Sequence, residues 1–210
     1  IPNYMFYQCS SLETIVIPYG VTSIGQDAFG YTSLRSVSIP ATVQTIGNYA
    51  FEARKDEGKL ASVTFEKEAD GSTALKTIGN VAFKYQCFPT IEIPKSVTSI
   101  GNNSFSCNPA LVSFTFEAGT QIKSFGTSLI ANCPLIETFT VPKSVTTLGN
   151  NDFENCTSLK SVIFEEGSAL TSVGSSTFKA SGIVSITFPE GVTTVSYTHL
   201  RAHETPEHLV

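Results

Sequence analysis

The chain repeats one sequence pattern about every 23 residues, and this period limits the folds that it can adopt. A glycine follows the second apolar pair of each repeat, at Gly25, Gly47, Gly79, Gly101, Gly126, Gly149 and Gly174, with Ser196 at the last position. Only the 32-residue interval between Gly47 and Gly79 requires an insertion, which residues 54–57 and 66–73 supply. Such periods are typical of solenoids, in which each turn, here called a coil, contacts only its neighbours.

Each repeat contains two segments that we expect to be short strands. The first follows L-x-x-[VIF]-x-[VIF], in which alternating β-branched or aromatic residues indicate a half-buried strand. It occurs at residues 12–17, 34–39, 60–65, 88–93, 111–116, 136–141, 159–164 and 183–188. Proline follows five of these segments, because it cannot donate to a strand ladder, and glutamate follows the other three. The second segment follows V-x-[ST]-[ILVF]-G-x-x-A-F.

These patterns predict a mostly β, right-handed solenoid of about eight coils over residues 1–196, with the eight first strands stacked as one parallel sheet along one face. The repeating glycine indicates either a positive φ or a close approach to the next coil. The phenylalanine that ends the second segment is expected to form an internal stack. Its members are Phe29, Phe51, Phe83, Phe105, Phe153 and Phe178, with Ile130 at one position.

The ends of the sequence depart from the repeat. Residues 1–6 align with the second half of a coil, so the chain begins in mid-coil, and we interpret it as a fragment of a longer protein. Residues 197–210 do not match the repeat and are expected to be disordered or derived from a cloning adapter. The formal net charge is −5 without a basic cluster, which argues against a nucleic-acid partner. No apolar run approaches the roughly 20 residues that a membrane span requires.

No group of residues in the repeats predicts catalysis, a cofactor or a metal site. The cysteines lack metal-ligand spacing, and their odd number cannot be fully paired. A disulfide or a reactive thiol is one interpretation, but their position in the repeat favours small apolar side chains that fill a turn. The acidic loop residues could bind calcium, although a solvated rim explains them better. The five cysteines are Cys9, Cys87, Cys107, Cys133 and Cys156.

Histidine is absent from the repeats, so their serines and threonines have no histidine to act as a general base. His199, His203 and His208 lie together near the end of the chain and could bind a metal, although a disordered end explains them better.

At the level of the whole repeat, the pattern F-x-x-C-x-x-L-x-x-V-x-I-P-x-x-V-T-x-I-G-x-x-A-F resembles the BspA-type leucine-rich repeat over about residues 1–196. This family occurs on the surfaces of bacteria and of some parasitic protists. The resemblance implies a curved solenoid, a cell-surface or secreted location, and adhesion to host matrix proteins or to other cells. The sequence is interpreted as lacking the asparagine ladder of better-known leucine-rich repeats, which argues against a regular horseshoe curvature but not against the solenoid.

Columns of hydroxyl side chains are the most regular feature expected on the surface. They could present hydroxyls to a protein or glycan, or order water as ice-binding solenoids do, but stacked serine and threonine also simply stabilise a parallel sheet. If the face binds an extracellular protein or glycan, we expect contacts spread over many coils. The residues expected to line it are Thr14, Ser36, Ser38, Thr64, Glu92, Thr115 and Thr140.

Two further interpretations remain open. The chain could be a stalk that presents another domain and has no ligand of its own. It could also associate with itself through the uncapped first coil, because an exposed strand edge favours pairing with a second copy.

Overall fold

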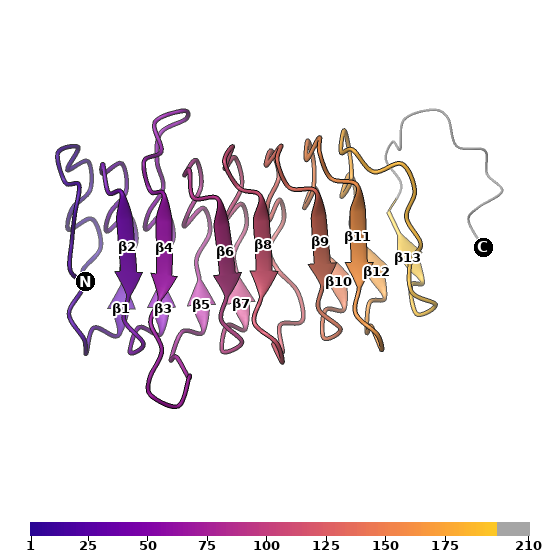
Figure 1. Ribbon diagram of the computed structural model, residues 1–210, viewed down its shortest axis with the longest axis horizontal. Coiled ribbons are helices and arrows are strands. Elements are labelled where there is room, and N and C mark those ends of the chain that lie inside the picture. The colour runs from indigo at the N-terminus through magenta and orange to yellow at the C-terminus, as the bar shows by residue number, and fades with distance from the viewer. Residues whose placement is uncertain (197–210) are drawn as a thin grey trace.

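The structure, a computed structural model, describes residues 1–196 and contains two rows of short parallel strands that stack along one axis (Figure 1). The front row consists of β2 (Ser36–Ile39), β4 (Ser62–Phe65), β6 (Thr90–Ile93), β8 (Ser113–Phe116), β9 (Thr138–Val141) and β11 (Ser161–Phe164). The back row consists of β1 (Ser23–Ile24), β3 (Thr45–Ile46), β5 (Thr77–Ile78), β7 (Ser99–Ile100), β10 (Thr147–Leu148), β12 (Ser172–Val173) and β13 (Thr194–Val195). The predicted mostly β solenoid with parallel strands is confirmed, and residues 1–196 contain no helix.

The front row differs from the single continuous sheet that the sequence predicts. Its strands form three separate pairs, β2–β4, β6–β8 and β9–β11. Residues 14–17 and 185–188, which lie within the first and last predicted strands, are not in strands. The prediction of eight strands in one sheet is therefore wrong, although six of the eight segments do form strands.

The residue that follows each front strand explains this pairing. Where glutamate follows, its backbone N–H donates to the preceding coil, as Glu117 N–H does to the Ile93 carbonyl at 2.9 Å. Glu66 and Glu165 donate in the same way to Ile39 and Val141. Where proline follows, no N–H is available for this bond. Each pair thus consists of a proline-ended strand followed by a glutamate-ended strand, and the ladder stops at the next proline-ended segment.

The predicted phenylalanine stack is present inside the solenoid. Consecutive rings from Phe29 to Phe105 are 5.1–5.4 Å apart and within 11° of parallel. Phe6 extends the stack at one end at 5.3 Å, and Phe153 and Phe178 continue it at the other. Burial of each phenylalanine contributes about 1.5–3 kcal/mol, so this stack supplies a large share of the stability.

The repeating glycines allow a close approach between coils, which is one of the two roles that the sequence predicted. None of them has a positive φ, but a Cβ at Gly101 would lie 2.5 Å from the backbone nitrogen of Asn80. Neighbouring coils therefore pack too closely there for a side chain.

An asparagine ladder follows the glycines, so the expectation that the chain lacks such a ladder is wrong. The Asn48 Oδ1 accepts the Asn80 N–H at 2.8 Å, and the Asn80 Oδ1 accepts the Asn102 N–H at 2.7 Å. Asn3, Asn102 and Asn150 accept from the next coil in the same way. These amides satisfy backbone donors where the two neighbouring coils approach most closely.

Candidate functional site

All the predicted contact residues lie exposed on the front of the solenoid. They are Thr14 in the first coil, Ser36 and Ser38 in β2, Thr64 in β4, Glu92 in β6, Thr115 in β8 and Thr140 in β9. Pairing places Ser38 beside Thr64 and Glu92 beside Thr115. The residues therefore form a surface that extends over several coils and do not converge on one point.

The burial of the inward side chains differs between the two strands of each pair. In β2, β6 and β9 the inward residues are buried, whereas β4 and β11 have half-buried inward residues. Because no strand within residues 1–196 pairs with the outer edge of β4 or β11, solvent reaches Val63 and Phe65 in β4, and Val162 and Phe164 in β11. Each of these two edges lines a groove.

The first groove lies between β4 and β6 and has a volume of about 200 Å³. It is lined by Val63, Thr64, Phe65, Lys67, Glu92 and Pro94. The groove brings together two of the predicted contact residues, Thr64 and Glu92, which stand 28 residues apart in the sequence. Its walls combine apolar surface with a hydroxyl, a carboxylate and an ammonium group.

One ion pair and one backbone hydrogen bond fix the Glu117 carboxylate near the first groove. Lys67 lies in the inserted loop 66–73, and its Nζ is 2.9 Å from the Glu117 Oε1. The other carboxylate oxygen of Glu117 accepts the Lys95 N–H at 2.9 Å. These two contacts, the backbone bond first, hold the pKa of Glu117 below its usual value. Lys67 is therefore already engaged by a carboxylate two coils away.

Glu92 has no such partner. It is exposed, and it makes no hydrogen bond or ion pair with the part of the chain that the structure describes. Its charge contributes to raising the pKa of Lys67, but less than Glu117 does. Glu92 is thus the one groove carboxylate left without a direct contact to a cation.

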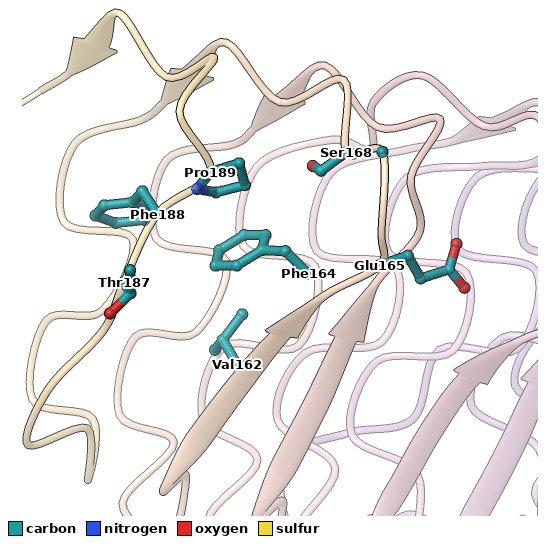
Figure 2. A pocket seen from close by; sticks show the side chains of 8 residues that line it. Val162, Phe164, Glu165, Ser168, Thr187, Phe188 and Pro189 are labelled. Carbon is teal, nitrogen blue, oxygen red and sulfur yellow. The ribbon is translucent and has the colours of Figure 1, made fainter.

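The second groove lies between β11 and residues 185–188 and has a volume of about 390 Å³ (Figure 2). The rings of Phe164 and Phe188 line it, with centroids 5.9 Å apart. The Glu165 side chain points away from these rings in Figure 2, and its carboxylate accepts the Lys143 N–H at 2.9 Å. Thr187 occupies the position that Glu92 has in the first groove. The second groove is therefore larger but contains no free carboxylate.

The third gap between pairs, from β8 to β9, is filled by aromatic rings. Phe114 occupies the position that Val63 has in β4, and its ring lies 5.9 Å from Phe139. Phe114 also contacts Phe105, and Phe139 contacts Phe153, at 5.1 and 4.8 Å. These rings bridge the interruption of the phenylalanine stack at Ile130. A phenylalanine closes this gap, whereas a valine leaves the other two open.

The cysteines are all free, and two of them match the expected role. Cys133 and Cys156 are buried, with their thiols directed at backbone carbonyls. Burial raises the pKa of Cys156 to about 12 and that of Cys133 well above its usual value. Cys87 and Cys107 are half-buried, but Cys9 is exposed, so the expectation that every cysteine fills a turn is wrong at Cys9.

One ionisable group in the core was not anticipated from the sequence. Asp152 occupies the position before the stacked phenylalanine, where Ala28, Ala50 and Ala82 stand in other coils. Its carboxylate accepts the Gly149 N–H at 2.6 Å and the Leu129 N–H at 3.2 Å. Burial nevertheless raises its pKa to about 7, because these two bonds only partly offset the loss of water.

The described residues contain no group of three or more side chains arranged to hold a metal ion. The possible histidine site at His199, His203 and His208 lies outside them, as does the whole 197–210 segment. Residues 1–196 also contain no helix long and apolar enough to cross a membrane.

Solved structures with a similar fold are bacterial leucine-rich repeat proteins. A leucine-rich repeat protein from Eubacterium ventriosum matches with a TM-score of 0.65 and 24% identity over 87% of this chain and 49% of its own. The pneumococcal vaccine antigen PcpA matches with a TM-score of 0.62 and 24% identity, over 82% of this chain and 57% of its own. A leucine-rich cell surface protein from Faecalibacterium prausnitzii matches with a TM-score of 0.54 and 22% identity, over 95% of this chain and 63% of its own. The chain spans less than two thirds of each of these structures, and the likeness concerns the fold.

Sequence comparison identifies the family directly. No curated protein sequence matches the chain. The model of the BspA-type leucine-rich repeat region matches residues 1–69 and 76–204, with six copies. The coil pattern, the parallel strands and this match over most of the sequence agree, and the chain belongs to the BspA-type leucine-rich repeat family.

Proposed function

We propose that the chain is a non-catalytic interaction scaffold and that its front row binds an extracellular protein or glycan. The observation that carries the proposal is the exposed front surface, on which regular hydroxyl columns are interrupted by a groove that joins Thr64 and Glu92. A continuous surface of this kind suits a large partner that contacts several coils at once.

The comparisons support a location at the cell surface or in secreted form. One similar structure is described as a cell surface protein and another as a vaccine antigen. Both descriptions suit a protein that meets other molecules outside the cell. Adhesion to a host matrix protein or glycan is the function that we propose on this basis.

The test is a binding screen of the chain against arrayed glycans and matrix proteins, with variants that block one face at a time. Ser38→Arg and Thr140→Arg place bulky side chains on the front row, and Thr45→Arg places one on the back row as the matched control. These positions are exposed, so the substitutions should leave the fold intact. We expect the front variants to weaken binding and the back variant to leave it unchanged.

Each outcome decides between the alternatives. Equal effects on both faces would refute the assignment of the front row. Silence of the wild-type chain across the whole array would instead favour the stalk, which has no ligand of its own. Catalytic turnover by the chain would contradict the non-catalytic proposal.

We also propose that copies associate through the first coil. Tyr4, Met5 and Val16 are 52%, 55% and 86% exposed there. Apolar surface next to an unpaired segment favours contact with a second copy. Light scattering across a range of concentrations should report an increasing mass, and Met5→Lys should reduce it. A mass that stays monomeric at all concentrations contradicts this association.

A further inference from the structure

We propose that the first groove accepts a lysine or arginine side chain from a protein partner, with Glu92 as its counter-ion. This inference rests on the proposed function of the front row and narrows it to a partner with a basic surface residue. The sequence predicts contacts that are spread over many coils. This inference instead assigns a larger share of the binding to one of the expected contact residues, Glu92.

The shape of the groove suits a long side chain with a charged end. Val63, Phe65 and Pro94 provide apolar surface along its walls. Lysine and arginine pack their methylene groups on such surfaces and keep the charged end near water. The Glu92 carboxylate lies exposed at the same groove, where it can receive that charged end.

The charges around the groove favour a cation over an anion. Lys67 is the only cation among the residues that line it, and its ammonium is held by Glu117 at 2.9 Å. Glu66 follows β4 directly and accepts the Ser38 hydroxyl. Glu117 is thus engaged by Lys67 and the Lys95 N–H, and Glu66 by the Ser38 hydroxyl, whereas Glu92 lacks a direct partner. An incoming cation would supply that partner, whereas an anion would meet the unpaired Glu92 carboxylate.

The second groove provides an internal comparison. It has the same valine and phenylalanine on its inner strand but carries Thr187 in place of Glu92. If the carboxylate determines recognition, this groove should not prefer cations. Thr187→Glu should then create a second cation site there. Thr45→Glu is the matched control, because Thr45 is also exposed but lies in β3 of the back row and lines neither groove.

The probes are N-acetyl-arginine amide and its neutral isostere N-acetyl-citrulline amide, titrated into the isotopically labelled chain and followed by NMR. The arginine probe should shift the backbone amide signals of Thr64 and Glu92 in a saturable way, and the citrulline probe should not. Glu92→Gln removes the charge without changing the shape and should weaken arginine binding about fivefold. Val63→Phe should fill the groove as Phe114 fills the β8–β9 gap, and should prevent binding.

The inference is overturned if arginine and citrulline shift the same signals equally, or if Glu92→Gln binds arginine as tightly as the wild type. If matrix proteins bind in the array and are unaffected by Glu92→Gln and Val63→Phe, the front row is a binding face but this groove is not its cation site. If the array stays silent while the arginine probe binds, the assignment of the groove stands and the adhesion proposal fails. A preference for glycans that is insensitive to Glu92 would also overturn the inference.

Discussion

Replacement of Asp152 by serine should change how the stability of the protein depends on pH. The folded-state pKa of about 7 lies above the ordinary value of 3.8, so the folded protein binds a proton more tightly than the unfolded chain. The contribution of Asp152 to stability is then fully present below about pH 3.8 and is lost as the pH rises through 7. The difference between the two pKa values corresponds to about 4 kcal/mol.

Serine is a suitable replacement because Ser104 occupies the same position in another coil. The Ser104 side chain carries no charge, and its hydroxyl donates to the Gly79 and Gly101 carbonyls. Asp152→Ser should therefore gain stability relative to the wild type as the pH rises from 4 to 8, by most of about 4 kcal/mol. Loss of the two backbone acceptor contacts shifts the stability difference by the same amount at every pH and leaves the change between pH 4 and 8 unaltered.

The assay is urea unfolding followed by circular dichroism at several pH values, with the free energy difference between variant and wild type taken at each. Taking the difference cancels the titration of all other groups. Asp56→Ser, in an exposed loop, controls for the loss of a carboxylate in general. A difference between Asp152→Ser and wild type that stays constant from pH 4 to 8 would refute the reasoning.

Three further substitutions test the packing of the coils. Phe83→Ala should cost about 3–5 kcal/mol of unfolding free energy, because this ring is fully buried and stacks at 5.1 and 5.4 Å on its two neighbours; a loss below 1 kcal/mol by urea unfolding would contradict the stack. Val81→Asn should stabilise the protein by about 1 kcal/mol and raise Tm by about 2–4 °C, because Val81 has a φ of 61° and asparagine adopts this left-handed backbone with less strain than valine. An unchanged or lower Tm would contradict this expectation. Gly101→Ala should lower the free energy of unfolding by about 1–3 kcal/mol. The loss should exceed that of Gly191→Ala, because a Cβ at Gly191 would lie 3.2 Å from its nearest neighbouring atom; equal losses would mean that the close contact between coils does not require glycine.

The general architecture could be predicted from the sequence because the same sequence signals recur in each coil. The period, the alternating strand segments and the stacked phenylalanines each recur in nearly every coil, so a local ambiguity in one coil is resolved by the others. The division of the front row into pairs was not predicted. Its signal is present in Glu66, Glu117 and Glu165, which stand where the other coils have proline, but the effect of this exchange acts between coils and not within one.

The candidate site was predicted in part. Alternation along the strands placed the contact residues on the exposed front, as the structure has them. Thr64 and Glu92 meet at a groove because β4 and β6 are not hydrogen-bonded to each other and because residue 63 is valine and not phenylalanine. Both effects act between coils. The Lys67–Glu117 ion pair joins residues 50 positions apart, and no local pattern indicates it. Asp152 was overlooked because its position holds small residues in most coils.

The central claim is that proline and glutamate, alternating after the front strands, divide that face into pairs and open the grooves. The most direct test is measurement of NMR couplings across hydrogen bonds in the labelled chain. We predict couplings from the N–H groups of Glu66, Glu117 and Glu165 to the carbonyls of Ile39, Ile93 and Val141. If these couplings are absent while the Gly79 N–H still couples to the Ile46 carbonyl in the back row, the account is contradicted.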